Sequence, residues 1–306
     1  MQVFRHFPTV KPSPLALAIG NFDGLHLGHQ LLLSRLQEVA QAQNLTPAVM
    51  TFEPHPREFF TPLNAPARLS NLREKLEYFQ SLNVQKVFVC AFNKHLAVIT
   101  ADEFMQNTLH NSLNANTILV GEDFKFGAKR AGTVTDFESN GFNLVKLSQL
   151  NFNGGRVSST RVRDALAAGD LSQASLLLAR PYSISGKVVH GAARGRELGF
   201  PTANVHMRHE RPALTGVYAV KLDGLNSVAN LGVRPTIAGV PKLLLEVHVI
   251  DFNGNLYGKH VHVAFLHKIR DEMKFESLDA LKAQIGQDIM VAKDYFNAVI
   301  PTKVGI

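Results

Sequence analysis

The fold of the first half of the chain is decided by Leu15-Ala16-Leu17-Ala18-Ile19-Gly20-Asn21-Phe22-Asp23-Gly24-Leu25-His26-Leu27-Gly28-His29. Its first five residues are apolar without polar alternation, which predicts a strand that is covered on both faces. Beyond the two histidines, Leu32, Leu36 and Val39 recur at helical spacing. A strand that turns through glycines directly into a helix is typical of an open parallel α/β sheet, where ligands bind at that turn.

The same alternation of strand and helix continues to about residue 180. The predicted strands are Leu15–Ile19, Ala48–Phe52, Lys86–Ala91, Thr117–Val120 and Asn143–Lys146. Helical patterns lie between them, around Leu72–Phe79 and Asp102–Leu113, and a last helical pair over Thr160–Leu178 is broken at Gly169. The sequence therefore predicts an α/β N-terminal domain with a Rossmann-like parallel sheet.

After residue 182 short alternating segments follow one another with little helix between them. The predicted strands are Ser183–His190, Gly216–Leu222, Ser227–Leu231, Leu243–Asp251 and His260–Leu266, and Asn253-Gly254 predicts a hairpin with Leu256–Tyr257. These strands favour a small antiparallel β-barrel, closed by a C-terminal helix with an apolar stripe from Leu278 to Phe296. We place the domain boundary near Arg180-Pro181, which gives domains 1–181 and 182–306.

Composition narrows the classes of partner. The chain has 306 residues with a net charge of +7, which favours anionic ligands. No run of five or more like charges is present, so we expect no nucleic-acid partner. No apolar stretch reaches roughly 18 residues, so we expect no membrane partner and a cytoplasmic protein of undecided oligomeric state. The single cysteine, Cys90, lies in an apolar run, which predicts a buried and inert thiol.

The turn at residues 20–29 has the features of a phosphate site. Gly24 and Gly28 allow the backbone to approach a phosphate, and the start of a helix favours an anion. His26 and His29 lie three residues apart and project to nearly the same side, which suits phosphoryl or nucleotidyl transfer. A metal-binding histidine pair and a purely structural pair remain alternatives.

A second fragment, Val157-Ser158-Ser159-Thr160-Arg161-Val162-Arg163, begins the last helical pair of the first domain. Ser159, Thr160 and Arg163 could all reach a polyphosphate. The alternative is an ordinary helix cap. The two fragments together favour a nucleotide site more strongly than either does by itself.

The predicted barrel contains a glycine-rich basic loop that leads into Pro201-Thr202-Ala203-Asn204. Its glycines permit close approach of phosphate, and its arginines can neutralise phosphate charge. Thr202 and Asn204 offer oxygen atoms of the kind that Mg²⁺ prefers. An ordinary basic turn is the alternative reading.

Glu246 places a carboxylate inside the otherwise apolar strand Leu243–Ile250. Because burial of an unpaired carboxylate is costly, Glu246 should face the rim, be paired or take part in chemistry. His248 lies on the same face, so a Glu–His or Glu–Arg pair remains open. The alternative is a general base that accepts a proton from a hydroxyl nucleophile.

The first two fragments resemble a known family. Gly-x-Phe-Asp-Gly-x-His-x-Gly-His, from Gly20 to His29, together with Ser-Ser-Thr-Arg-x-Arg, from Ser158 to Arg163, resembles the nucleotidylyltransferase superfamily. The resemblance is closest to the FMN adenylyltransferase module of bacterial bifunctional riboflavin kinase/FAD synthetases, and it extends over residues 14–180.

The second domain resembles riboflavin kinase over residues 182–297. The pattern Gly-x-x-x-Gly-Arg-x-Leu-Gly-x-Pro-Thr-Ala-Asn runs from Gly191 to Asn204. Further matching segments are Gly216-Val217-Tyr218, Asn230–Thr236, Leu245–His248 and Ile269–Phe275.

The resemblance implies two reactions: riboflavin and ATP give FMN and ADP, and FMN and a second ATP give FAD and pyrophosphate, with Mg²⁺ accompanying ATP. For the kinase it implies that Thr202 and Asn204 hold Mg²⁺-ATP, Glu246 is the base and Arg270 closes over flavin or phosphate, with further binding contacts from Gly186, Gly191, Gly195, Arg196 and Pro201. For the adenylyltransferase it implies charge stabilisation by His26, His29, Ser159, Thr160 and Arg163, with binding contacts from Gly20, Asn21, Phe22, Asp23, Gly24, Gly28 and Asp123.

Three other functions remain open at this point. A basic RNA-binding protein fits the charge but leaves the motifs unexplained. A flavin-dependent oxidoreductase would keep a bound yellow cofactor. A single-activity adenylyltransferase with a degenerate second domain is the nearest alternative, and a direct assay of riboflavin phosphorylation separates it from the bifunctional enzyme.

Overall fold

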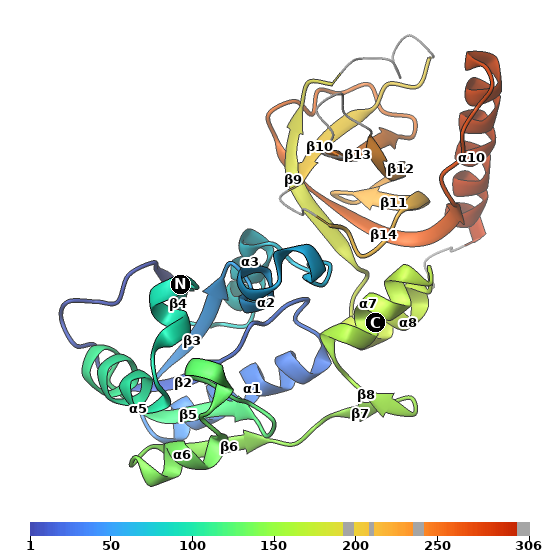
Figure 1. Ribbon diagram of the computed structural model, residues 1–306. Helices are drawn as coiled ribbons and strands as arrows, with labels where there is room; N and C mark the ends of the chain where they lie inside the picture. The colour runs from blue at the N-terminus through green and yellow to red at the C-terminus, as the bar shows by residue number, and fades with distance from the viewer. Residues whose placement is uncertain (192–198, 208–210, 235–241, 299–306) are drawn as a thin grey trace. The chain divides into compact units, whose positions relative to one another are not determined.

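The computed structural model describes residues 1–191, 199–207, 211–234 and 242–298, which form two compact units (Figure 1). Unit 1 comprises residues 1–66 and 70–159, and unit 2 comprises residues 67–69 and the chain from residue 160 onward. The domain boundary at residues 181 and 182 stays a prediction.

Unit 1 is built on a six-stranded parallel sheet in the order β1-β4-β3-β2-β5-β6. The strands are β1 (Gln2–Phe4), β2 (Leu15–Ile19), β3 (Thr46–Glu53), β4 (Lys86–Ala91), β5 (Ala115–Gly121) and β6 (Asn143–Leu147). The five predicted strands and the α/β class are thus confirmed. Strand β1 was not predicted, because three largely exposed residues at a sheet edge give no hydrophobic pattern.

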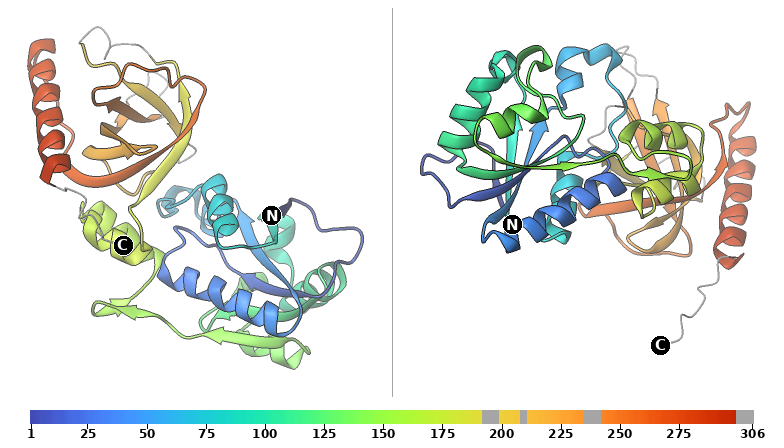
Figure 2. Two further views of the ribbon diagram at one scale, coloured as in Figure 1. Left: turned by 180° about the vertical axis from the view of Figure 1, so that it is seen from behind. Right: turned by 90° about the horizontal axis from the view of Figure 1, so that it is seen from below.

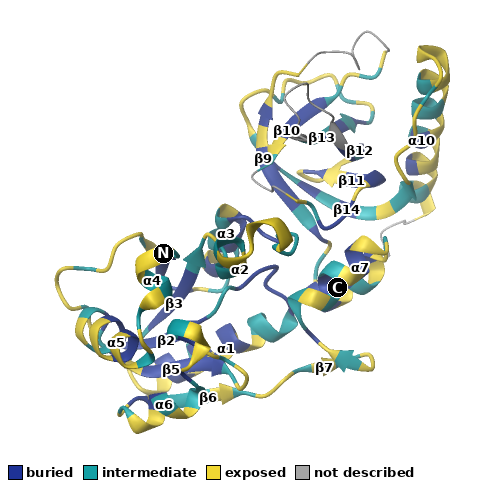
Figure 3. Cartoon of the chain, in the orientation of Figure 1, coloured by how far each residue is buried: buried dark blue, intermediate teal, exposed yellow. Residues whose placement is uncertain are grey.

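Helices cover both faces of this sheet, as β2 illustrates. All five β2 residues are buried (Figure 3). Ala16 and Ala18 belong to one core cluster with residues of α1 (Leu27–Ala42) and α3 (Leu72–Ser81). Leu15, Leu17 and Ile19 belong to a second cluster, with the π-helical segment η2 (Phe104–Ser112) and α6 (Val134–Ser139). Burial on both sides explains why β2 lacks polar alternation.

The other elements of unit 1 are short. They are α2 (Pro56–Phe60), η1 (Pro62–Asn64), α4 (Lys94–Val98), α5 (Ala101–Glu103), η3 (Ala128–Arg130) and the hairpin strands β7 (Asn151–Phe152) and β8 (Gly155–Arg156). The thiol of Cys90 is buried in β4, and burial raises its pKa to about 12. The prediction of a buried cysteine is therefore confirmed, and a raised pKa is what an unreactive thiol requires.

Unit 2 contains an antiparallel barrel, seen from two further sides in Figure 2. The barrel is closed, with the strand order β10-β13-β12-β11-β14-β9. Its strands are β9 (Ser183–Val189), β10 (Ala203–Met207), β11 (Gly216–Leu222), β12 (Leu225–Arg234), β13 (Lys242–Val249) and β14 (His260–Arg270). Helices α7 (Ser159–Ala167) and α8 (Leu171–Leu178) precede the barrel, and α10 (Leu278–Ala298) follows it. The predicted small antiparallel barrel with a C-terminal helix is confirmed.

Two details of the barrel differ from expectation. Strand β10 was not predicted, because it begins inside Pro201-Thr202-Ala203-Asn204, directly after a glycine-rich stretch that favours a loop. The predicted hairpin at Asn253-Gly254 is wrong. Strand β13 is already paired on both edges, with β10 and β12, so Leu256–Tyr257 form no strand and the chain continues to β14.

Helix α10 packs against the barrel through the predicted stripe. Ile289 and Phe296 lie in a cluster with Val217 and Ala219 of β11. No helix among the described ranges is both long and apolar enough to pass through a membrane.

Candidate functional site

The first candidate site lies where β2 ends and α1 begins. The connecting loop takes left-handed backbone angles at Phe22 (φ 51°), Gly24 (φ 81°) and Leu25 (φ 42°). Two of these residues are not glycine, so the loop stores strain. The side chains of Phe22 and Leu25 are fully buried, which holds the strained backbone in place. A strained loop fixed by its own core residues is typical of a functional site.

His26 and His29 stack face to face at the start of α1, with ring centroids 3.7 Å apart and planes 16° apart. His26 is the N-cap residue of α1, and its Nδ1 accepts a hydrogen bond from the backbone N–H of His29 at 3.4 Å. With Nδ1 as the acceptor of this bond, a ring proton of His26 lies on Nε2. A Cβ at Gly28 would lie 3.3 Å from this ring, so glycine gives it room.

The environment of His29 keeps the imidazole neutral. Burial, followed by the nearby His26 and the ammonium of Lys75, holds the pKa of His29 well below its ordinary value. Its Nδ1 is buried and has no hydrogen-bond partner among the described residues. Among the described residues, no third histidine, cysteine, aspartate or glutamate groups with these two histidines as a possible metal ligand.

Ser159 and Asp23 join the two sequence fragments in unit 1. The Ser159 hydroxyl donates to the Asp23 carbonyl at 2.8 Å. The buried Asp23 carboxylate accepts the backbone N–H of Ser70 at 3.0 Å. The Ser159 hydroxyl thus bonds directly to the histidine loop within unit 1, and Asp23 organises the loop.

Thr160 and Arg163 follow Ser159 in α7 and belong to unit 2. Thr160 is exposed. Arg163 donates from Nε to the Ala67 carbonyl at 2.6 Å, which ties α7 to the short segment 67–69 of the same unit. Contact of these two side chains with nucleotide stays a prediction.

Of the other residues expected at the first site, Phe22, Gly20 and Gly24 shape the loop, and Asp123 lies at the surface. The side chain of Phe22 is a core residue, against Phe79 at a centroid distance of 5.3 Å, so only its backbone can contact a substrate. Gly20 and Gly24 likewise shape the loop. Asp123 is exposed and forms an ion pair with Arg156 at 2.6 Å.

Sequence reasoning missed two features of this site. Lys75 is buried and donates from Nζ to the Asn21 carbonyl at 3.2 Å. A cluster of phenylalanines lies where β3 and β4 end, with Phe52 and Phe92 6.1 Å apart and Phe60 and Phe92 5.6 Å apart, and Phe59 lies between. The available signals were a lysine within the apolar stripe of α3 and an excess of phenylalanine after two predicted strands.

The second candidate site lies on the outer face of the barrel. Glu246 on β13 is paired with Asn204 on β10 and with Asn230 on β12. Leu245 and Val247 point into the barrel and are fully buried, so Glu246 lies on the opposite face. The register therefore places the carboxylate between two carboxamides.

Neighbouring residues fix the Pro-Thr-Ala-Asn segment. His248 Nδ1 bonds to the Pro201 carbonyl at 2.9 Å. A Cβ at Gly191 would overlap the Asn204 carboxamide, so the backbone lies directly on this side chain. The oxygens of half-buried Thr202 and buried Asn204 fit Mg²⁺, which prefers such ligands when it accompanies phosphates.

Gly186 and Arg270, two expected kinase residues, have other surroundings. Gly186 is paired on both edges of β9, with Met207 and Val261, and a Cβ there would overlap the His206 carbonyl. Arg270 binds Asp288 of α10 through Nε and Nη2, the latter at 2.7 Å. Gly195 and Arg196 lie outside the described residues.

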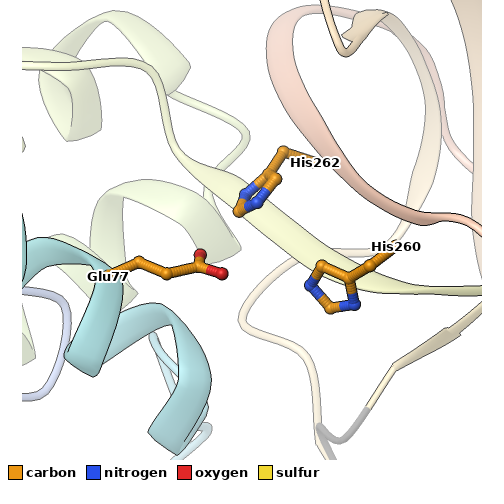
Figure 4. Close-up of side chains that lie close together, drawn as sticks. All are labelled: Glu77, His260 and His262. Atoms are coloured by element: carbon orange, nitrogen blue, oxygen red, sulfur yellow. The ribbon is translucent and has the colours of Figure 1, made fainter.

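Strand β14 carries a second histidine pair. His260 and His262 alternate with buried Val261 and Val263, so both imidazoles lie on the outer face of the barrel (Figure 4). Their ring centroids are 5.6 Å apart and the planes are at 81°. We assign this pair no chemistry.

Comparison with known proteins covers both units. The family model for FAD synthetase matches residues 9–161, and that for riboflavin kinase matches residues 178–296. The chain is 46% identical to the bifunctional riboflavin kinase/FMN adenylyltransferase of Haemophilus influenzae, over 92% of this chain and 94% of that protein. It is 43% identical to the protein of that name from Escherichia coli, over 98% of this chain and 100% of that protein.

A solved structure matches the whole fold. The crystal structure titled as a macrolide-efflux protein from Streptococcus pneumoniae aligns with a TM-score of 0.80 at 30% identity. The alignment covers 96% of this chain and 99% of that chain. The parallel sheet followed by a barrel is therefore an arrangement already seen in a single polypeptide.

Proposed function

The chain belongs to the bifunctional riboflavin kinase/FMN adenylyltransferase family, and we propose that it makes both flavin cofactors in sequence. Riboflavin and ATP give FMN and ADP, and FMN and a second ATP then give FAD and pyrophosphate. The observation that carries this proposal is the full-length similarity, with both family models matching in chain order. Each matched part also contains its own cluster of groups suited to phosphate.

In the kinase reaction, the riboflavin 5′-hydroxyl oxygen attacks the γ-phosphorus in line, and the bond to the ADP oxygen breaks. Glu246 takes the hydroxyl proton. Support comes from the position of Glu246 between Asn204 and Asn230, because carboxamides orient a carboxylate without neutralising it. Thr202 and Asn204 would hold Mg²⁺, which when bound offsets the charge on the phosphate oxygens.

In the adenylylation reaction, an FMN phosphate oxygen attacks the α-phosphorus of ATP and pyrophosphate leaves. The phosphate is already an oxyanion, so no general base is needed. The work of the protein is to position the reactants and stabilise charge. We assign this charge stabilisation to His26 and to the neutral imidazole of His29, which stacks on it.

The start of α7 supplies the third part of this proposed site. The Ser159 hydroxyl proton is committed to the Asp23 carbonyl, so Ser159 acts by fixing the histidine loop rather than by donating to substrate. Thr160 and Arg163, one and four residues further along α7, are the proposed contacts to the triphosphate.

We place the flavin ring of FMN on the phenylalanine cluster. Phe52 and Phe92 lie at the carboxyl ends of β3 and β4, the edge at which ligands of parallel sheets bind. Phe60 is 61% exposed although it is a large apolar side chain. A planar isoalloxazine ring would cover this exposed aromatic surface.

The proposed setting is the cytoplasm, where ATP and riboflavin are both available. The deciding experiment incubates the purified chain with ATP, Mg²⁺ and riboflavin and separates the products by chromatography. We expect FMN first and then FAD. Formation of FAD from supplied FMN but no phosphorylation of riboflavin would instead identify a single-activity adenylyltransferase.

A further inference from the structure

Lys75 is a buried lysine that the proposed adenylylation chemistry does not yet use. It lies on α3 at the spacing of the apolar residues Leu72, Leu76 and Phe79, and it is only 2% exposed. Lysine is almost never fully buried, because removal of the ammonium from water is costly. A lysine retained in an apolar stripe therefore calls for a specific role.

The ammonium of Lys75 is directed at the loop that carries the first site. Its Nζ donates to the Asn21 carbonyl at 3.2 Å, and the same carbonyl accepts the Thr51 hydroxyl at 3.2 Å. Asn21 immediately precedes the strained residues Phe22 to Leu25. Lys75 and Thr51 thus fix the loop at the point where it leaves β2.

Two polar atoms beside this contact are buried without a partner among the described residues. They are Asn21 Oδ1 and His29 Nδ1. Buried polar atoms are nearly always bonded, so two orphans at one loop mark a place where a ligand or water completes the bonding. The Lys75 charge also acts on His29, together with the neighbouring His26, and favours the neutral imidazole.

We propose that Lys75 is a positioning residue of the adenylylation site, which fixes the Asn21 carbonyl and sets the electrostatic field in which His29 meets the phosphates. The inference rests on the proposed function of unit 1. Lys75 acts through Asn21 and His29, so it needs no contact with substrate. A positive charge that is fixed in place also favours an incoming polyphosphate.

Three variants separate the two parts of this role. Lys75→Arg keeps both charge and donor, Lys75→Gln keeps a donor without charge, and Lys75→Met removes both. Lys11→Met is the matched control, because Lys11 is exposed before the amino end of β2, away from the carboxyl end where the loop lies. Riboflavin phosphorylation by the same chain serves as an internal reference.

The first readout is FAD synthesis from supplied FMN. We expect Lys75→Met to lower kcat/KM by about tenfold to a hundredfold. Lys75→Arg should restore most of that loss, and Lys11→Met should have no effect. Riboflavin phosphorylation should stay at the wild-type rate in all four variants.

The second readout is the titration of His29, followed by NMR of the histidine ring. The midpoint should move upward in Lys75→Met and Lys75→Gln, and it should stay in place in Lys75→Arg and Lys11→Met. This titration can be measured whether or not the protein synthesises FAD. If the wild type makes no FAD, the proposed function fails, and the His29 midpoints still decide whether Lys75 acts on this site.

Wild-type kcat/KM and an unmoved His29 midpoint in folded Lys75→Met would overturn the inference. If Lys75→Met does not fold, a comparison of Lys75→Gln with Lys75→Arg tests the inference. A shifted midpoint in Lys75→Gln with normal Lys75→Arg supports the role, and equal behaviour of the two variants contradicts it.

Discussion

Asn204 on β10 and Glu246 on β13 are directly opposed residues of one antiparallel strand pair. Opposed side chains point to the same face, so the proposed ligand of Mg²⁺-ATP and the proposed base share one surface of the barrel. Their Cβ atoms are held about 5 Å apart by the strands themselves. In the proposed reaction, the pairing would bring the γ-phosphate and the proton acceptor together on rigid elements.

This arrangement predicts that Glu246→Ala removes one activity only. FMN formation should fall by about 10²- to 10⁴-fold, because the attacking hydroxyl loses its proton acceptor. FAD synthesis from supplied FMN should remain close to wild type. Initial rates of both reactions, measured by chromatography, check the prediction. Glu246→Gln is the control of equal size, and loss of both activities in a folded protein would show that the division of labour is wrong.

His29→Ala should have the opposite effect. FAD synthesis should fall by about 10²- to 10³-fold, because a group placed to stabilise phosphate charge is removed. Riboflavin phosphorylation should be unchanged. His29→Asn retains a hydrogen-bond donor and should lose less activity than His29→Ala. Equal loss in the two variants would argue that the ring, rather than its hydrogen bonding, is what the site requires.

The lowered pKa of His29 predicts how stability depends on pH. In the unfolded chain His29 takes up a proton near pH 6.5, whereas in the folded protein it does so only at lower pH. The unfolded state therefore binds more protons between these values, so the contribution of His29 is fully present above about pH 6.5 and is lost as the pH falls. The loss is at most about 1.4 kcal/mol per pH unit.

Thermal unfolding of the wild type and of His29→Asn from pH 8 to pH 5 measures this effect. The Tm of the wild type should fall relative to that of His29→Asn below about pH 6.5, because the variant lacks the titrating ring. A constant difference in Tm across this range would contradict a lowered pKa.

Strand β2 and the histidine pair could be predicted from the sequence, because the pattern that produces each lies within a short segment. Strand β2 is buried on both faces, and its run of apolar residues records that directly. The stacked His26 and His29 follow from helical spacing at the start of α1. In both cases the signal lies within a short segment.

Other features depend on residues that are distant in sequence. The pairing of Asn204 with Glu246 is set by closure of the barrel, and β10 itself is hidden behind a glycine-rich stretch. Lys75 stands out in the sequence only as a lysine within the apolar stripe of α3, and the fold alone brings the Asn21 carbonyl to its ammonium. No local pattern contains these relationships, so sequence reasoning missed them.

Gly191→Ala should impair the kinase selectively. A Cβ at this position would overlap the Asn204 carboxamide, and either the backbone or the proposed Mg²⁺-ATP ligand must move. We expect the KM for ATP in riboflavin phosphorylation to rise about tenfold or more, with FAD synthesis from FMN unchanged. Gly286→Ala in α10 is the matched control in the same unit, because an added Cβ there meets no atom within 4 Å and the backbone is not left-handed. An unchanged KM in Gly191→Ala would show that Asn204 does not position the nucleotide.

Arg270 and Asp288 provide the last test, which distinguishes a structural role from a binding role. The guanidinium is 18% exposed and the carboxylate 4%, and the two side chains join β14 to α10. Removal of either partner leaves a buried charge unpaired, so Arg270→Ala and Asp288→Ala should each cost about 3–5 kcal/mol. The double variant should cost much less than the sum, because the penalty of the remaining charge disappears. Chemical unfolding of the four proteins measures this coupling. If Arg270 also closes over flavin or phosphate, Arg270→Ala should raise the KM for riboflavin or ATP more than Asp288→Ala does. If the two variants have equal KM values, the function of Arg270 is to link β14 to α10.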